Sequence, residues 1–319
     1  MRCAEEIRRL WPVAYARCVR DKLEKVVPLS SHLALTACIQ RCIARRRFML
    51  QGSGLKVTLR GGLERLVREL GEEKVEELPY VAGLLHDLGK ASTYYLTRYS
   101  REEVTFPGHE HVIALLLEYM ASKEESEGYI AAYDLLAKTI SRHHAAMDKR
   151  HPNKFFSGSG SISYISKVLR GMLHHTSFIN NLARYCGSRD SLCYYTLNSI
   201  SRSLNEISRT WGEDTPSNIL LYANPIKIFG LSGLASASEL TVYAFTTVLT
   251  GTLIVADNIS AEFCEERGSD DGASSTYVTY WKWELGLRGD EGFKNLLRDC
   301  LNSCIPELPD ECTYLKRHT

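Results

Sequence analysis

A histidine, an aspartate and a lysine stand close together in an otherwise apolar stretch, GLLHDLGKAS, at residues 83–92. Lys90 follows Asp87 by three positions and His86 by four. On a helix such spacings share one face, so Lys90 projects over the same patch as the pair. Imidazole and carboxylate groups bind divalent cations, a bound cation lowers the pKa of water, and a lysine can hold a phosphate oxygen. The three side chains therefore predict metal-assisted hydrolysis at phosphorus, with Asp87 and Lys90 as catalytic residues.

The glycines of this stretch do not make a phosphate-binding P-loop. That loop requires four residues between its glycines and a Ser or Thr after the lysine. Here five residues separate Gly83 from Gly89, and Ala91 follows Lys90. We expect Gly83 to permit close helix packing and Gly89 to loosen or end the turn. Lys90 has a second interpretation, as a solvated cation at a helix end.

Eight of the ten histidines lie within the segment from His86 to His175. A single histidine on an apolar helix is more often a packed residue than a metal ligand, but a cluster favours a metal site. Within GLLHDLGK, the sequence resembles the HD superfamily of metal-dependent phosphohydrolases, whose minimal pattern is a first His, the HD pair and a distal Asp. His32 is the one histidine upstream of the pair, and Asp257, in LIVADNISAEF, matches the distal Asp. A helix-end aspartate that is solvated or paired with an arginine is the alternative for Asp257.

Two further motifs, PGHEH at 107–111 and ISRHHAAM at 140–147, are similar to additional motifs of the HD nuclease of type I CRISPR interference systems. The resemblance implies two metal sites bridged by Asp87. One site would be held by His32, His86, Asp87 and Asp257, and the other by Asp87, His109, His143 and His144. Ile113 and Ala145 depart from the family's usual Ser and Gly, which would alter a substrate contact and no ligand.

Other histidines leave alternatives open. His174 and His175 form a rival pair, which could instead line a cleft or pack. His111 lies two residues from His109, so the two would diverge by about 200° on a helix, and one ligand there is expected rather than two.

The resemblance implies a metal-dependent nuclease that cleaves single-stranded DNA, or RNA, together with a separate helicase subunit and a CRISPR RNA-guided surveillance complex. A nitrogen-rich ligand set favours Mn, Co, Ni or Fe over Mg as the divalent metal, one or two ions in number. An HD phosphohydrolase acting on nucleotides or cyclic phosphates is an alternative, as is a non-catalytic HD interaction module.

Contacts to nucleic acid would have to come from local patches, because the net charge is only +1 and the pI about 7.6. Basic residues next to aromatic ones suit a single strand, whose backbone is anionic and whose bases stack. Candidates follow the HD pair (Tyr94, Tyr95, Arg98, Tyr99 and Arg101) and the HH pair (Lys149, Arg150, Lys154, Phe155 and Phe156). The triplet Arg45–Arg47 is interpreted as a solvated face.

Helical periodicity dominates the chain, which predicts an all-α bundle with a dinuclear metal centre. Helices are expected near 30–48, 62–77, 79–96, 109–123, 128–143, 161–185, 191–210 and 237–265. Residues 1–265 would form the catalytic domain and 266–319 a C-terminal appendage packed on it. The apolar run at 240–256 is expected to be a buried helix, and no membrane association is expected.

The ten cysteines form no CxxC motif, and we interpret them mainly as small buried apolar residues. Scarce glutamine, present only at Gln40 and Gln51, suggests a thermophile, in which intracellular disulfides occur. The N-terminus lacks the features of a signal peptide, so a cytoplasmic location is expected.

Overall fold

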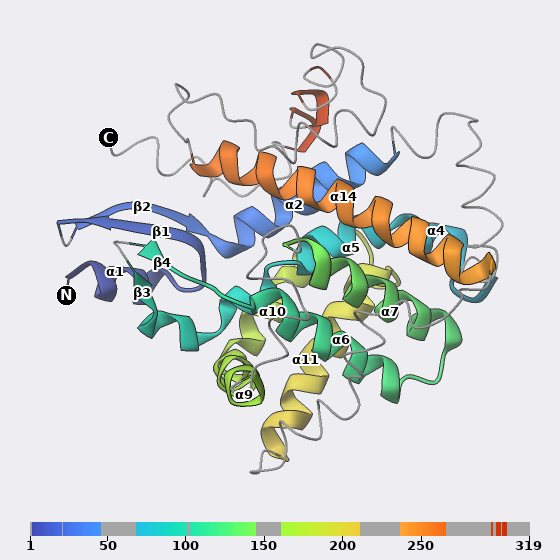
Figure 1. Ribbon diagram of the computed structural model, residues 1–319, viewed down its shortest axis with the longest axis horizontal. Coiled ribbons are helices and arrows are strands. Elements are labelled where there is room, and N and C mark those ends of the chain that lie inside the picture. The colour runs from blue at the N-terminus through green and yellow to red at the C-terminus, as the bar shows by residue number, and fades with distance from the viewer. Residues whose placement is uncertain are drawn as a thin grey trace.

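The computed structural model describes residues 2–20, 22–45, 68–100, 103–144, 161–210, 237–265, 295, 298–300 and 302–304. Within these ranges the chain is mostly helical, with one small sheet near the N-terminus (Figure 1). The predicted helical fold is confirmed. Most of 266–319 lies outside the described residues, so the division into a domain and an appendage stays a prediction.

The α-helices in chain order are α1 (Arg2–Leu10), α2 (Leu29–Ala44), α4 (Glu72–Glu76), α5 (Leu78–Leu85), α6 (His109–Lys123), α7 (Glu127–Arg142), α9 (Ser161–Met172), α10 (Thr176–Leu182), α11 (Leu192–Arg209) and α14 (Ala237–Glu265). Short 3₁₀ helices lie between them: η2 (Leu88–Ala91), η3 (Thr93–Thr97), η5 (Leu173–His175) and η6 (Ala183–Tyr185). The predictions for α2, α6, α7, α11 and α14 agree with the structure to within a few residues at each described end.

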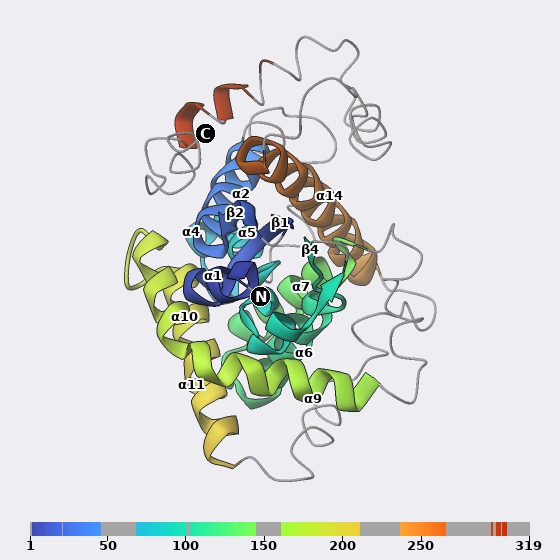
Figure 2. The same ribbon diagram turned by 90° about the vertical axis from the view of Figure 1, so that its left-hand side faces the viewer.

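Helix α5 lies at the centre of the fold and is buried along its whole length. Helix α14 crosses over α2 and α5, while α9, α10 and α11 lie on the opposite side of the molecule (Figures 1 and 2). A Cβ atom on Gly83 would lie 2.5 Å from the Cα atom of Ala37, so α2 and α5 approach too closely for a side chain there. This agrees with the predicted packing role of Gly83.

The predicted helix at 79–96 is wrong beyond Leu85, where α5 ends. His86 and Asp87 lie in a turn, followed by η2 and η3. Ser92 explains part of the break, since its Oγ accepts a hydrogen bond from the Tyr94 amide and caps η3. Serine competes in this way with continuation of a helix. The predicted helix at 161–185 is likewise divided, into α9, η5, α10 and η6.

The sheet was not predicted. It has the order β2-β1-β4-β3, built from β1 (Val13–Val19), β2 (Lys22–Pro28), β3 (Tyr99–Ser100) and β4 (Glu103–Val104), and neighbouring strands pair antiparallel. Along β1 the buried positions Ala14, Ala16 and Cys18 alternate with the more exposed Tyr15 and Arg17. The alternation is easily missed in the sequence because alanine and cysteine give a weak hydrophobic signal.

Eight cysteines form disulfides, which corrects the interpretation that the cysteines are mainly small apolar residues. The pairs are Cys3–Cys18, Cys38–Cys304, Cys42–Cys300 and Cys186–Cys193. Two of them join α2 to the same C-terminal segment, with Cα atoms 5.8 and 5.6 Å apart. Cys38 and Cys42 are one helical turn apart, as are Cys300 and Cys304. The two disulfides therefore lie side by side between the same two segments.

Helix α14 is buried at most of its positions between residues 246 and 256, as the sequence predicts. Among the described residues, no helix is both long enough and apolar enough to cross a membrane.

Candidate metal centre

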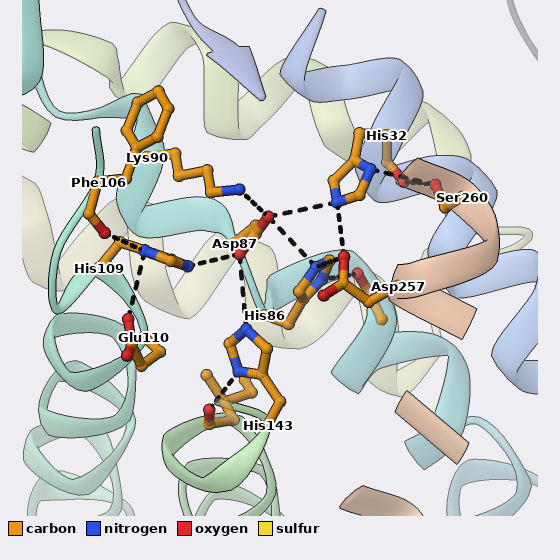
Figure 3. Close-up of polar contacts among 12 residues, drawn as sticks. His32, His86, Asp87, Lys90, Phe106, His109, Glu110, His143, Asp257 and Ser260 are labelled. Atoms are coloured by element: carbon orange, nitrogen blue, oxygen red, sulfur yellow. Dashed lines mark hydrogen bonds and ion pairs between the residues drawn. The ribbon is translucent and has the colours of Figure 1, made fainter. Parts of the chain in front are cut away.

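The turn after α5 places His86 and Asp87 among side chains from four other helices (Figure 3). These side chains are His32 from α2, His109 at the start of α6, His143 and His144 at the end of α7, and Asp257 from α14. They fall into two groups, and the possible ligand atoms of each lie within 4.8 Å of one another. The structure thus brings together all seven residues predicted as metal ligands, and their ligand roles remain predictions.

The first group is His32, His86, Asp87 and Asp257. The Nε2 atom of His32 lies 3.1 Å from Asp257 Oδ1 and 3.3 Å from Asp87 Oδ2. The Nε2 atom of His86 lies 3.3 and 3.4 Å from the same two oxygens. Four potential ligand atoms therefore face one small volume.

The second group is Asp87, His109, His143 and His144. The Oδ1 atom of Asp87 lies 2.6 Å from His109 Nε2 and 3.6 Å from His143 Nε2. The ring of His144 lies 3.9 Å from that of His143, centroid to centroid. Asp87 thus turns Oδ2 toward the first group and Oδ1 toward the second, the arrangement of a carboxylate that bridges two ions.

Contacts behind the rings orient the histidines. The Nδ1 atoms of His86, His109 and His143 lie 2.8, 2.6 and 2.6 Å from the carbonyl oxygens of Gly83, Phe106 and Ile140. A carbonyl can only accept, so each Nδ1 carries a proton and each Nε2 is turned inward. Such backing is typical of metal-bound histidines. In the described part of the chain, the buried Nε2 atoms of His143 and His144 have no hydrogen-bond partner, which a metal would provide.

Helices α2 and α14 are held together near the first group. The Nε2 atom of Gln40 donates to the carbonyl of Leu249 at 3.1 Å. Ser260 Oγ lies 3.1 Å from His32 Nδ1, and it also donates to the carbonyl of His32 at 3.2 Å. These contacts fix the position of His32 relative to Asp257, three residues before Ser260.

In the metal-free protein, positively charged side chains compensate the buried carboxylates of the centre. Burial would lower the pKa of His86, but the carboxylates of Asp87 and Asp257 outweigh burial and raise it to about 10. Burial would raise the pKa of Asp87, yet His86, Lys90 and His109 hold it well below its usual range. The pKa of Asp257 is also lowered against burial, by His86 and His32. The carboxylates are therefore ionised, and divalent cations could replace the protons that compensate them.

Lys90 directly contacts the bridging carboxylate. Its Nζ lies 2.6 Å from Asp87 Oδ2, and it also lies 5.3 Å from the centre of the Phe106 ring. The solvated helix-end interpretation of Lys90 does not fit this contact. The side chains of Lys90 and Asp257 are 16% and 17% exposed, whereas that of Asp87 is 1% exposed. Solvent therefore reaches the centre beside Lys90 and Asp257.

Gly89 lets the segment that follows His86 and Asp87 approach the start of α6 closely. A Cβ atom at Gly89 would lie 2.3 Å from the carbonyl oxygen of His109. The glycine is therefore required for close approach, beyond the predicted loosening of the turn.

Neither alternative to the predicted ligands joins the two groups. His174 is exposed and His175 partly exposed, both on η5. His111 is buried, and its Nε2 lies 3.8 Å from Glu110 Oε1. Glu110 and Ser260 were missed by the sequence reasoning. For Glu110, the available signal was its position directly after His109.

The predicted nucleic-acid residues are only partly described. Arg98 donates to the Tyr94 hydroxyl at 2.7 Å, and its guanidinium lies over the Tyr94 and Tyr164 rings at 4.9 and 5.4 Å. Tyr95 is buried and donates to the Pro107 carbonyl at 3.0 Å, which makes it a packing residue. The remaining candidates Arg101, Lys149, Arg150, Lys154, Phe155 and Phe156 lie outside the described residues. Arg45 is exposed, as the solvated-face interpretation predicts, whereas Arg46 and Arg47 also lie outside them.

Comparison with known proteins gives one family match. Residues 59–190 match the family model of the HD domain. This segment includes the HD pair and the whole second group, while His32 and Asp257 lie on either side of it. Searches among curated proteins and among solved structures gave no match.

Proposed function

We propose that this protein is a metal-dependent phosphohydrolase of the HD type, built on two buried His/Asp groups, and that it is a nuclease that hydrolyses phosphodiester bonds of single-stranded DNA or RNA in CRISPR interference. The observation that carries the proposal is the pair of ligand groups sharing Asp87. A minimal HD centre needs only the first group. The second group matches the additional motifs that the sequence shares with HD nucleases.

The ligand sets suit divalent cations. Each group combines imidazole nitrogens with carboxylate oxygens, which favours Mn, Co, Ni or Fe, with Mg as the oxygen-preferring alternative. When bound, a pair of such ions would activate water and stabilise the leaving oxygen of an in-line displacement at phosphorus.

Side chains of the protein would connect the two ligand groups and bind the substrate. Asp87 connects the two ligand groups, because one of its carboxylate oxygens faces the first group and the other faces the second. Lys90 neutralises Asp87 in the structure, and because it lies at the exposed side, its ammonium group is placed to take a substrate phosphate oxygen. Arg98 and the Tyr94 ring would contact the strand beyond the scissile bond, by charge and stacking.

Partners follow from the same resemblance. We propose a separate helicase subunit that supplies the single strand, and a CRISPR RNA-guided surveillance complex that directs both to a target. These partners are tested by co-purification with the products of neighbouring genes.

The substrate is tested by incubating purified protein with single-stranded DNA, single-stranded RNA, duplex DNA, nucleotides and cyclic dinucleotides. Each substrate is assayed with Mg, Mn, Co, Ni or Fe(II), and with chelator as the blank. We expect cleavage of single-stranded DNA, much slower cleavage of the duplex and none with chelator. Rapid hydrolysis of nucleotides or cyclic dinucleotides, with single-stranded DNA and RNA intact, would establish the small-molecule phosphohydrolase instead.

A further inference from the structure

A carboxylate that is not among the predicted ligands lies directly behind the second group. Glu110 is completely buried, and its Oε2 lies 3.2 Å from the Nδ1 atom of His109 (Figure 3). Its other oxygen lies 3.8 Å from His111 Nε2. Among the described residues, neither oxygen has a hydrogen-bond partner of good geometry. Burial of an ionised carboxylate is costly without a compensating charge, so the position of Glu110 calls for a cation nearby.

The histidines of the centre differ in what stands behind them. His86 and His143 are backed by the carbonyl oxygens of Gly83 and Ile140, and His32 by the hydroxyl of Ser260. His109 has the Phe106 carbonyl at 2.6 Å and, in addition, the Glu110 carboxylate. Of these four rings, only that of His109 has a carboxylate of a described residue within 4 Å of its Nδ1.

The two groups also differ in charge. The first group holds two carboxylates, Asp87 and Asp257, whereas the second shares Asp87 and otherwise consists of neutral ligands, the imidazoles of three histidines. A divalent cation in the second group would therefore be less well neutralised by its direct ligands. Glu110 adds one negative charge next to the His109 ring, 3.2 Å from its Nδ1 atom, while the Nε2 atom of the same ring lies 2.6 Å from Asp87 Oδ1.

We infer that Glu110 is the positioning residue that allows the second group to hold its ion. Its carboxylate lies 3.2 Å from the Nδ1 atom of His109, whose proton is donated to the Phe106 carbonyl, and its negative charge beside the ring strengthens Nε2 as a donor to the ion. It also compensates the charge of the ion. The inference rests on the metal centre of the proposed function and is independent of the substrate.

The test compares Glu110→Gln with Glu118→Gln, a matched control. Glu118 is also buried on α6 but belongs to neither ligand group, so its variant removes a buried carboxylate from the same helix outside the centre. Metal-stripped protein is titrated with Co(II) and with Mn(II), and binding is followed by calorimetry and by metal analysis after gel filtration.

We expect Glu110→Gln to weaken binding of one of the two ions by about 10–100-fold and to leave the other within about twofold. Glu118→Gln should bind both ions as the native chain does. Thermal unfolding in chelator adds a readout that separates the roles. Since His109 and His111 lie 3.2 and 3.8 Å from the Glu110 carboxylate and can compensate its charge in chelator, the decisive comparison is the rise in unfolding temperature on adding metal, which should be smaller for Glu110→Gln than for the native chain.

Two ions bound with native affinity by Glu110→Gln would overturn the inference, as would equal weakening of both. A variant that fails to fold in chelator, or whose unfolding temperature rises on adding metal as much as that of the native chain, would assign Glu110 to the fold itself. None of these results depends on cleavage, so failure of the nuclease proposal would be seen separately.

Discussion

At the scale of single residues, Asp87 is the one side chain in the described part of the chain that belongs to both ligand groups. It is almost fully buried, and its two oxygens face different sets of partners. A defect at this position should therefore affect both metals, whereas a defect at a histidine should mainly affect one.

We expect Asp87→Ala to lose both metals and to reduce hydrolysis by at least about 1,000-fold, since positioning and charge stabilisation fail together. Metal analysis and a single-turnover assay measure the two effects. Asp134→Ala is the control, because Asp134 pairs with Lys138 on the partly exposed side of α7. Intact metal content and hydrolysis in Asp87→Ala would refute the assignment.

Variants of Lys90 should change the rate of hydrolysis without changing metal binding. Lys90→Ala is expected to keep both ions while lowering the rate of hydrolysis by about 100-fold, the size of effect seen when one charged donor is removed from a transition state. Lys90→Arg should recover part of the rate. A large loss of metal in Lys90→Ala would show that the lysine supports the centre and does not contact substrate.

The shifted pKa values predict how the stability of metal-free protein depends on pH. The pKa of His86 is about 10 in the fold against 6.5 when unfolded, so its contribution to stability is complete below pH 6.5 and declines as the pH rises toward 10. His32 shifts in the same direction. The lowered pKa values of Asp87 and Asp257 contribute above pH 3.8 and lose that contribution as the pH falls through their folded values.

In chelator, the urea midpoint should therefore fall from pH 6.5 to 9.5. With saturating Mn(II) it should fall less or rise, because metal replaces the protons and binds better as they leave. A midpoint that rises with pH in chelator would contradict the assigned charges.

Motif resemblance in the sequence predicts seven ligand positions, and the structure brings these residues together, while their binding of metal stays a prediction. It could not predict Glu110 or Ser260 as partners of the ligand rings. A glutamate beside a histidine is common, and its orientation toward Nδ1 depends on the start of α6. The contact of Ser260 with His32 depends on the packing of α14 against α2.

At the scale of elements, the centre depends on a turn rather than on a helix face. Sequence periodicity correctly predicts the helices that surround the turn, because in each of them apolar residues recur at helical spacing over several turns. It fails at 86–96, where apolar residues continue while Ser92 and the close approach at Gly89 end the regular helix. Short β-strands are missed for a related reason, since β1 is built largely from small residues.

Gly89→Ala should destabilise the fold by about 1–3 kcal/mol, the usual cost of forcing extra volume into a packed site. Its Cβ would meet the backbone of His109, which cannot move without shifting a ligand, so second-ion binding should also weaken. Gly187→Ala is the control, because a Cβ there would meet nothing within 4 Å. Equal unfolding midpoints for the two variants would show that the turn adapts freely.

At the scale of the whole molecule, disulfides join parts of the chain that are far apart in sequence. The bonds Cys38–Cys304 and Cys42–Cys300 span 266 and 258 residues. Paired spacings of four in two segments were the available signal, but pairing cannot be read from spacing alone. The predicted appendage is thus covalently attached to α2, the helix that carries His32.

The pairing can be checked by mass spectrometry of alkylated, unreduced protein. Trypsin cuts after Arg41, between Cys38 and Cys42, and chymotrypsin can cut after Leu301, between Cys300 and Cys304. The two possible ways of pairing these four cysteines therefore give different disulfide-linked peptides. Cys42→Ser should lower stability by about 2–4 kcal/mol through loss of one long-range cross-link. Free thiols at these positions, or the opposite pairing, would contradict the arrangement.

The first ligand group also has a consequence for how the protein is made. His32 lies near the beginning of the chain, and Asp257, the fourth member of its group, is synthesised 225 residues later (257 minus 32). The second group lies wholly between residues 87 and 144 and can assemble much earlier. A growing chain could therefore capture one ion while still on the ribosome, but it could complete the pair only after Asp257 had emerged. Catalytic competence would then be withheld from truncated chains.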